Sequence, residues 1–293
     1  MDDIRNLLEK TVPGSVPTAA PAPTSKVTKG EDGGDLKRVR APRLGGAAAL
    51  RPRGNTWMLV LCLVFLLMPA APVEGQPSDV YFEVQRRRMV EEQIARRGIK
   101  QQEVLEAMAK VPRHLFVPSI YTTRAYEDRP LPIGRGQTIS QPYIVALMTE
   151  LLELGPSSKV LEVGTGSGYH AAVLSQVAGE VYSIEILRDL AESARDRMGQ
   201  LGYRNVEIRQ GDGYQGWAEK GPFDAIILTA APAEPPRPLL DQLKVGGKLV
   251  LPQGSGPVQD LLVLTKTQET LERQKVAAVR FVPMTGEAEN REE

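Results

Sequence analysis

Residues 159–252 constrain the fold most, because short apolar segments alternate there with amphipathic ones. The apolar segments have the length of buried strands and are 159–163, 180–185, 205–210, 223–230 and 247–252. The intervening segments that are expected to be helices are 169–178, 187–202 and 238–243. Strands that alternate with helices pair in parallel and are covered by helices on both faces. We therefore expect an α/β domain built on a doubly wound, mostly parallel sheet.

The segments on either side of this alternation complete the expected domain. Residues 259–284 predict two strands, and we expect these to be antiparallel because no long connection separates them, which gives a seven-strand sheet. An added N-terminal helical segment is expected before the sheet, with helices from 78 or 79 to 97, over 101–111 and over 142–154. The compact domain is thus expected over residues 78–286, followed by a disordered tail at 287–293.

The N-terminal part of the chain has a different composition. Residues 1–56 are rich in Pro, Gly, Ala, Thr and Ser without an apolar period, so we expect them to be disordered. An apolar run at 57–68 is too short for a membrane-spanning helix, which needs about 20 residues. Val73 and Gly75 then stand where a signal peptidase requires small residues, but a secretory signal begins nearer the N-terminus. The segment 57–75 is therefore an export signal, an anchor in contact with a membrane, or an extension without function.

The charge balance and the residue counts exclude several classes of protein. The 293 residues include 36 Lys and Arg against 36 Asp and Glu, so the chain has no basic excess for binding a polyanion. This argues against a nucleic-acid partner. With one cysteine, Cys62, and two histidines, the chain has too few soft ligands for a structural zinc site. We therefore expect no protein-bound metal ion.

The sharpest local signal is an acidic residue followed by a glycine run where the first strand turns into a helix. Glu162 precedes Gly164, Gly166 and Gly168, and glycines at such a turn let the backbone approach a ligand closely. A dinucleotide fingerprint would need glycine at position 169, which is Tyr169. The spacing GxGxG with a preceding acid indicates S-adenosylmethionine instead. The alternative interpretation is a purely structural strand-to-helix turn.

Two further acidic residues follow the next two strands. Glu185 ends the second strand, where its carboxylate can accept hydrogen bonds from both ribose hydroxyls of an adenosine ligand. Asp212 lies just past the third strand between Gly211 and Gly213, where it can accept from the exocyclic amine of an adenine. The structural alternatives are a surface acid near a helix start and a simple Asp-Gly turn. All three sites fall at carboxyl ends of strands, where open α/β sheets bind ligands.

These motifs and their surroundings resemble the protein-L-isoaspartate (D-aspartate) O-methyltransferase family in its bacterial form. The resemblance covers residues 86–284. It rests on the segments VPRHLFVP (111–118), YEDRPLPIGRGQTISQPYIVALMTELLEL (126–154), VLEVGTGSGYHAAVL (160–174), GDGYQGW (211–217), PFDAIILTAA (222–231), LKVGGKLVLP (243–252) and VRFVPMTG (279–286). The glycine loop occurs in many methyltransferases, whereas GQTISQP (136–142) is specific to this family. The first 75 residues depart from the compact family domain.

The resemblance implies a Rossmann-like, S-adenosylmethionine-dependent methyltransferase fold. The implied reaction moves a methyl group from S-adenosylmethionine to the free carboxylate of L-isoaspartyl and D-aspartyl residues in damaged proteins, and the ester then closes to a succinimide that reopens partly as normal aspartate. A carboxylate is already an anionic nucleophile, so this chemistry needs alignment and exclusion of water rather than a general base. S-adenosylmethionine is the expected cofactor, damaged proteins and peptides are the expected partners, and we expect a monomer.

The resemblance also assigns an acceptor site. Ser140 matches the active-site serine of the family and is expected to hold an acceptor oxygen or to orient the donor. Thr138, Ile139 and Gln141 belong to the same loop and are expected to line the acceptor cleft. Taken alone, Ser140 would be interpreted as a cap of the helix that begins at Pro142. The two histidines, which follow Arg113 and Tyr169 in the chain, are expected to be bystanders.

Other functions remain open at this point. The glycine loop alone also allows a methyltransferase of another carboxylate or of a small molecule, a non-catalytic module that binds an adenosine nucleotide, and, least of all, a nicotinamide-dependent dehydrogenase. A Ser-His-Asp hydrolase is not favoured, because position 166 is glycine where the nucleophile elbow needs serine. We expect a cytoplasmic protein, since S-adenosylmethionine is made in the cytosol, with export or anchoring through 57–75 as the alternative.

Overall fold

The computed structural model describes residues 77–291 of the chain. They belong to one compact unit, Ala71–Glu293. The extension at 1–56 and the signal-like segment at 57–75, which the sequence predicted, lie outside the described residues. Within the described part of the chain, no helix is long and apolar enough to cross a membrane.

The unit is built on a seven-stranded sheet with the order β5-β4-β3-β6-β7-β8-β9. Its strands are β3 (Lys159–Val163), β4 (Glu180–Glu185), β5 (Val206–Gln210), β6 (Phe223–Leu228), β7 (Leu243–Gln253), β8 (Gln259–Lys266) and β9 (Leu271–Val279). β3 to β7 pair in parallel, and β8 is antiparallel to both of its neighbours, which confirms the predicted mostly parallel sheet. The strand order reverses beside β3, and such a reversal leaves a crevice at the carboxyl ends of the strands.

Four helices accompany the sheet within the described residues: α5 (Pro142–Leu151), α6 (Tyr169–Leu174), α7 (Arg188–Leu201) and α8 (Arg237–Gln242). Pro142 stands in the first turn of α5, where its missing N–H costs no hydrogen bond. α7 ends at Gly202, which adopts the left-handed conformation with φ of 79°. α6 is shorter than the expected 169–178, because the chain continues in tight turns in which Gln176 and Val177 donate to carbonyls three residues back.

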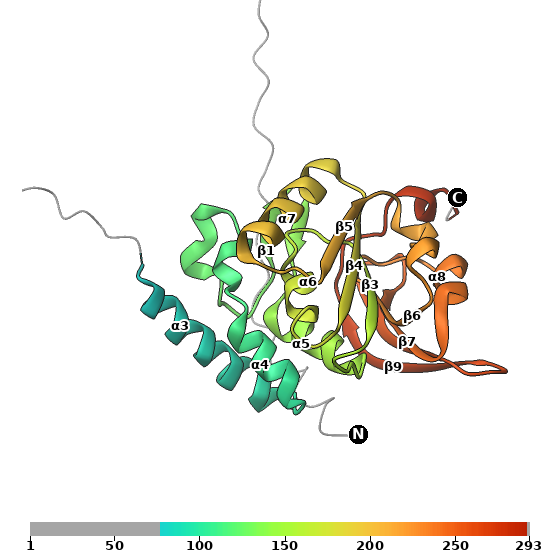
Figure 1. Ribbon diagram of the computed structural model, residues 1–293, viewed down its shortest axis with the longest axis horizontal. Helices are drawn as coiled ribbons and strands as arrows, with labels where there is room; N and C mark the ends of the chain where they lie inside the picture. Colours follow the sequence, from blue (N-terminus) through green and yellow to red (C-terminus); the bar gives the residue numbers. More distant parts are fainter. Residues whose placement is uncertain (1–76, 292–293) are drawn as a thin grey trace, which may run out of the picture. The chain divides into compact units, whose positions relative to one another are not determined.

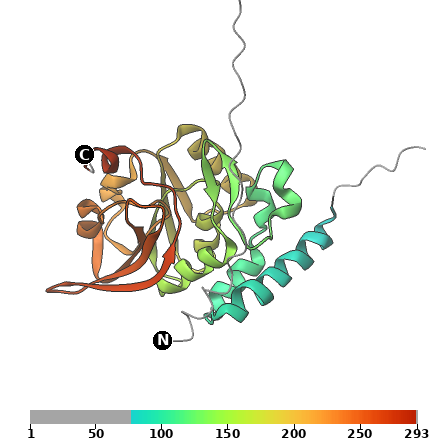
Figure 2. The ribbon, with the colours of Figure 1, turned by 180° about the vertical axis from the view of Figure 1, so that it is seen from behind.

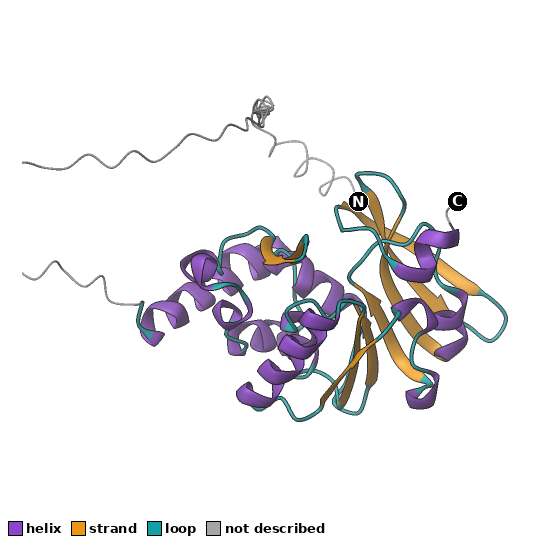
Figure 3. Cartoon of the chain, turned by 90° about the horizontal axis from the view of Figure 1, so that it is seen from above, coloured by secondary structure: helices purple, strands orange, loops and turns teal. Residues whose placement is uncertain are grey.

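Helices lie on both sides of the strands, as Figure 3 shows. One cluster of buried side chains contains Val160 and Ile227 and packs with α5, α6 and α7. The other contains Leu161 and Leu228 and packs with α8 and the short helices after β5. Neighbouring residues of one strand thus face opposite cores, since side chains alternate along a strand. Burial on both faces explains why the strands appear in the sequence as continuous apolar runs.

The N-terminal helical segment begins with three consecutive stretches, α3 (Asp79–Arg88), the π-helical η1 (Met89–Ile94) and the 3-10 helical η2 (Ala95–Arg97). The Ser78 hydroxyl caps the first by accepting a hydrogen bond from the Tyr81 N–H at 3.3 Å. Gly98 ends the last with φ of 100°. The extent matches the single helix that was expected. α4 (Gln102–Lys110) and the 3-10 turns η3 (Arg113–Phe116) and η4 (Ser119–Arg124) follow.

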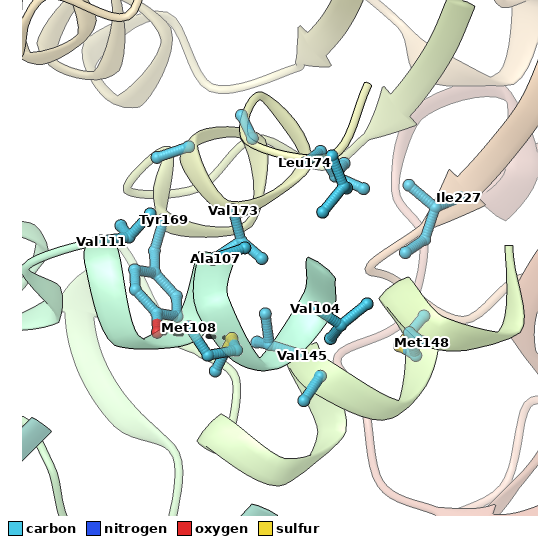
Figure 4. Close-up of a cluster of buried hydrophobic side chains, with 14 of the residues drawn as sticks. Val104, Ala107, Met108, Val111, Val145, Met148, Tyr169, Val173, Leu174 and Ile227 are labelled. Carbon is cyan, nitrogen blue, oxygen red and sulfur yellow. Dashed lines mark hydrogen bonds between the residues drawn. The ribbon is translucent and has the colours of Figure 1, made fainter. Parts of the chain in front are cut away.

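Figure 4 shows how α4 joins this segment to the sheet. The labelled side chains pack into one cluster and are Val104, Ala107, Met108 and Val111 of α4 with its C-cap, Val145 and Met148 of α5, Tyr169, Val173 and Leu174 of α6, and Ile227 of β6. The Tyr169 hydroxyl donates to the Met108 sulfur at 3.8 Å. Figures 1 and 2 place α3 and α4 on one side of the unit and β9 on the other. The added helices therefore share a core with the sheet.

Two further segments differ from the sequence expectation. The connection before α5 contains a hairpin, β1 (Leu131–Gly134) and β2 (Gln137–Ile139), labelled β1 in Figure 1. Glycine and proline obscure the alternation of so short a hairpin in the sequence. The predicted disordered tail at 287–293 is wrong over 287–291, because this stretch belongs to the 3-10 helix η7 (Gly286–Arg291). Ala288 of η7 is buried in the core beside α8, and this apolar contact orders the segment.

Met108 of α4 tests whether the added helices and the sheet share one core. Its side chain is 0% exposed, so we expect Met108→Ala to lower the free energy of unfolding by about 2–5 kcal/mol. Val84 on α3 is 56% exposed, and Val84→Ala is the matched control that should change it by less than about 0.5 kcal/mol. Urea unfolding of the full chain, followed by circular dichroism, measures both. Equal effects of the two substitutions would contradict the shared core.

Candidate active site

The glycine loop between β3 and α6 adopts a backbone that requires glycine. Gly164 has φ of 100°, and a Cβ atom there would overlap the Thr229 hydroxyl. Gly168 has φ of 86°, and a Cβ atom there would meet the Met198 side chain of α7 at 2.7 Å. Gly166 is also left-handed, with φ of 55°. The predicted glycine run therefore forms a tight turn at the carboxyl end of β3.

Hydrogen bonds from three elements hold this loop. The Gly164 N–H donates to the carbonyl of Ile184 in β4 at 2.8 Å. The Thr229 hydroxyl, after β6, donates to the Gly164 carbonyl at 2.6 Å. Arg197 of α7 donates to the carbonyl of Ser167 at 2.8 Å. The loop is thus fastened to both strands that flank β3 and to the helix that follows β4.

Glu185, at the end of β4, lies directly beside the loop. Its Oε2 atom accepts from the Gly166 N–H at 2.7 Å, and its Oε1 atom accepts from the Leu187 N–H at 3.0 Å. The side chain is 5% exposed. The structure therefore brings this carboxylate to the glycine loop, where the sequence predicted it. A carboxylate has about four lone-pair positions, so two remain for a ligand.

Glu162 is buried beneath the loop. Its Oε2 atom accepts from the Ser183 hydroxyl at 2.5 Å, and Ser183 lies 2.6 Å from the Thr165 hydroxyl. The Oε1 atom is buried without a hydrogen-bond partner among the described residues. Burial raises the pKa of this carboxyl to about 8, against the Ser183 hydrogen bond, and Glu185 raises it further. Such an unpaired buried oxygen is costly unless a ligand satisfies it.

Asp212, after β5, caps a short 3-10 turn, η5 (Gly213–Gln215). Its Oδ1 atom accepts from the Tyr214 N–H at 2.9 Å, and its Oδ2 atom accepts from the Glu287 N–H at 2.8 Å. The structural alternative of an Asp-Gly turn is thus present, with the C-terminal η7 as a second partner. A Cβ atom at Gly213 would overlap the Val163 side chain, so this turn packs closely on β3.

The acceptor loop follows β2. The Ser140 hydroxyl makes no hydrogen bond to any residue of the described chain, and the N-cap of α5 is Gln141, which forms no capping bond with its side chain. The capping alternative for Ser140 is therefore wrong. Thr138 is exposed, whereas Ile139 is 4% exposed, pairs with Leu131 and lies in the core. Ile139 thus faces the core while Thr138 faces outward, because alternate residues of β2 point to opposite sides.

The hairpin brings the acceptor loop to the glycine loop. The Ile133 side chain of β1 lies against Gly166, because a Cβ atom at this glycine would approach Ile133 Cδ1 at 3.2 Å. At the hairpin turn, Arg135 forms an ion pair with Asp189 in the first turn of α7. Sequence reasoning missed both hairpin residues, although Gly134 and Gly136 around Arg135 were a turn signal.

A mostly parallel sheet whose strand order reverses beside β3, with a glycine loop after β3 and acidic residues at the ends of β4 and β5, is the Rossmann-like arrangement of the S-adenosylmethionine-dependent methyltransferase class. The family model of Protein-L-isoaspartate(D-aspartate) O-methyltransferase matches residues 84–289. The chain belongs to this family.

Individual relatives and solved structures agree. Two proteins named protein-L-isoaspartate O-methyltransferase are 58% identical over 221 residues, in Synechococcus sp. (strain JA-2-3B'a(2-13)), and 56% identical over 200 residues, in Gloeobacter violaceus. The matches span 72% and 68% of this chain and 91% and 98% of the relatives. A solved structure of the same name is 31% identical with a TM-score of 0.65, covering 70% of this chain and 69% of its own. A Plasmodium falciparum structure with bound S-adenosyl-L-homocysteine is 28% identical with a TM-score of 0.59, covering 68% and 98%.

Gly213 tests the close packing of the turn after β5. We expect Gly213→Ala to weaken S-adenosylhomocysteine binding by about tenfold or more, since the added methyl group displaces Val163 at the end of β3. Gly199→Ala is the matched control, because a Cβ atom at this position of α7 meets nothing within 4 Å. The control should bind normally and gain up to about 1 kcal/mol of stability. Isothermal titration calorimetry measures the binding, and normal binding by Gly213→Ala would contradict the packing.

Glu162 predicts a pH dependence of stability. Its pKa is raised from 4.5 to about 8, so the unfolded chain ionises first and the stability from this group, full below about pH 4.5, is lost as the pH rises toward 8. Glu162→Gln cannot ionise and escapes this loss. The stability of the variant relative to the native protein should therefore rise from pH 5 to pH 8. Urea unfolding at both pH values measures it, and a difference that does not change with pH would rule out the raised pKa.

Proposed function

We propose that the chain methylates the free carboxylate of L-isoaspartyl and D-aspartyl residues in damaged proteins with S-adenosylmethionine, and that the acceptor carboxylate binds at Ser140. Family membership supports the activity. The contact of the hairpin with the glycine loop supports the acceptor position, because Ser140 follows β2 directly and Ile133 of β1 lies against Gly166. An acceptor at Ser140 would face the loop that holds the methyl donor.

The residues at the ends of β3, β4 and β5 fit the donor. S-adenosylmethionine supplies a methyl group on a positively charged sulfur that is a good leaving group. The unpartnered Oε1 atom of Glu162 would be satisfied by the ammonium group of the methionine part. Glu185 would accept from the ribose hydroxyls and Asp212 from the adenine amine, since each carboxylate has acceptor capacity beyond its two backbone partners. The glycines Gly164, Gly166, Gly168 and Gly213 would let the backbone approach the ligand.

The protein's task in this reaction is positioning. The acceptor is an anion at neutral pH, so its oxygen needs no proton removed before it reacts. The Ser140 hydroxyl, free of other partners in the described chain, would donate to one carboxylate oxygen and leave the second directed at the methyl group. The hairpin over the glycine loop would exclude water. The resulting methyl ester closes to a succinimide, which begins the repair.

The two histidines support a mechanism without a protein base. The His170 Nε2 atom is 3.0 Å from the Thr149 hydroxyl, and burial lowers the pKa of this histidine to about 3. The His114 Nδ1 atom is 2.7 Å from the Tyr126 hydroxyl, and burial lowers its pKa as well. His170 is therefore too weak a base to remove a proton at neutral pH, and both rings are hydrogen-bonded within the fold, as expected of bystanders.

The location and the oligomeric state are part of the proposal. The protein would act in the cytoplasm, where the methyl donor is made, and a mature exported form beginning at Gln76 would contradict this. It would act as a monomer, since both faces of its sheet are covered by its own helices, and contact with a membrane would be made through residues 57–68 alone. Light scattering and N-terminal sequencing of the purified protein test these points.

The activity is tested with methyl-labelled S-adenosylmethionine and two peptides that differ only in isoaspartate or aspartate at one position. We expect base-labile label on the isoaspartyl peptide alone, because only there is a carboxylate presented as the acceptor loop requires. Label on neither peptide, with the cofactor still bound, would favour another acceptor or a binding role and would contradict the proposal.

Ser140→Ala tests the acceptor site. We expect kcat/KM for the isoaspartyl peptide to fall on the order of tenfold to a hundredfold, the loss of one hydrogen bond to a charged group, while the Kd of S-adenosylhomocysteine stays within about twofold. Ser255→Ala, the same chemical change at an exposed loop position, is the control and should leave both values unchanged. Full activity of Ser140→Ala would remove Ser140 from the site.

A further inference from the structure

We infer that Arg113 positions the acceptor loop and supplies the fixed positive charge that draws the acceptor carboxylate to Ser140, an inference that rests on the proposed function. Arg113 begins η3, and its side chain is 0% exposed. A buried guanidinium costs free energy unless its hydrogen bonds and charge are used. Its partners therefore indicate its role.

Three contacts hold the guanidinium of Arg113. The Nε atom donates to the Ala125 carbonyl and the Nη2 atom donates to the Ser140 carbonyl, both at 2.7 Å. The guanidinium carbon lies 4.8 Å from the centre of the Tyr169 ring, which is the first residue of α6 after the glycine loop. A planar guanidinium fixes such contacts at set angles. One side chain thus links the acceptor loop to the element that follows the donor loop.

The charge of Arg113 has no carboxylate partner. None of the ion pairs among the described residues includes it, and its buried Nη1 atom has no hydrogen-bond partner there. Burial lowers its pKa to about 10, so the side chain stays positive at neutral pH. Weakly screened charges act strongly in a protein interior. An uncompensated cation behind Ser140 therefore favours an anionic acceptor over a neutral one.

Arg97 provides a contrast, because its charge has a carboxylate partner. Its Nη1 atom pairs with Asp128 at 2.9 Å, and its side chain is 33% exposed. The Gln141 side chain donates to the Asp128 carbonyl at 3.2 Å, so this pair also touches the loop. The charge of Arg97, however, is compensated by the Asp128 carboxylate and screened by solvent.

The test compares two ligands, an isoaspartyl peptide and the same peptide with a carboxamide in place of the acceptor carboxylate. Their Kd values are measured on the full chain with S-adenosylhomocysteine bound. We expect the native protein to bind the carboxylate about tenfold more tightly than the carboxamide. Arg113→Lys should keep this preference but have a lower kcat. The positive charge stays, whereas the planar guanidinium that donates to the Ala125 and Ser140 carbonyls is lost. Arg113→Gln should reduce the preference to about twofold or less.

The ratio of the two Kd values separates this role from a structural one, since a loosened acceptor loop would weaken the binding of both peptides equally. Arg195→Gln is the control, because Arg195 also donates to a backbone carbonyl, that of Ile208, at 3.2 Å, on the α7 side of the sheet. It should keep the native preference. If Arg113→Gln prefers the carboxylate peptide over the carboxamide peptide as strongly as the native protein does, the inference is overturned.

These measurements distinguish a failure of the proposed function from a failure of the role of Arg113. If the native protein does not methylate the isoaspartyl peptide, the proposed function fails. If it does but binds both peptides equally, the role of Arg113 fails and the function stands. If Arg113→Gln does not fold, judged by thermal melting and S-adenosylhomocysteine binding, then the native protein and Arg113→Lys decide, and loss of the preference in Arg113→Lys overturns the inference.

Discussion

The turn that Gly164 makes at the carboxyl end of β3 fixes the position of the glycine loop, around which the candidate site is built. Without a side chain at Gly164, the Thr229 hydroxyl reaches the loop carbonyl at 2.6 Å, and the Gly166 N–H reaches Glu185 at 2.7 Å. These bonds fasten the loop to both neighbours of β3, where the strand order reverses. The crevice that every open α/β sheet has at this place is therefore bordered by backbone and by carboxylates, which suits an adenosine-containing cation.

The acceptor side depends on elements outside the sheet. The hairpin contacts the glycine loop through Ile133 and is joined to α7 by Arg135, while Arg113 holds the backbone at Ser140 from behind. For an anionic acceptor to react with a methyl group on a positively charged sulfur, the protein has little more to do than hold the two groups in contact and exclude water. The added N-terminal helices are thus required for the reaction as we propose it, because they carry the residues that fix the acceptor loop, and the sheet alone would bind only the donor.

The sequence predicted the sheet, its mostly parallel pairing and the glycine loop, because each depends on local apolar runs and on glycines that any such turn requires. It did not predict the hairpin or η7, since both depend on residues far away in the chain: the hairpin contacts Gly166, and η7 packs through Ala288 into the core and donates to Asp212. Whether Ser140 caps a helix or binds the acceptor was also open in the sequence, because the answer depends on contacts between residues far apart in the chain. Only the three-dimensional arrangement reveals that its hydroxyl caps nothing, and that Ile139 points into the core.

In the proposed complex, the acceptor and donor loops meet so that a carboxylate at Ser140 faces the methyl group. A crystal structure of the full chain with S-adenosylhomocysteine and an isoaspartyl peptide tests this geometry. We expect the isoaspartyl carboxylate within hydrogen-bond distance of the Ser140 hydroxyl, between the hairpin and the glycine loop, with Glu185 on the ribose. A peptide bound away from the acceptor loop, or a nucleoside bound away from Glu185, would contradict this arrangement.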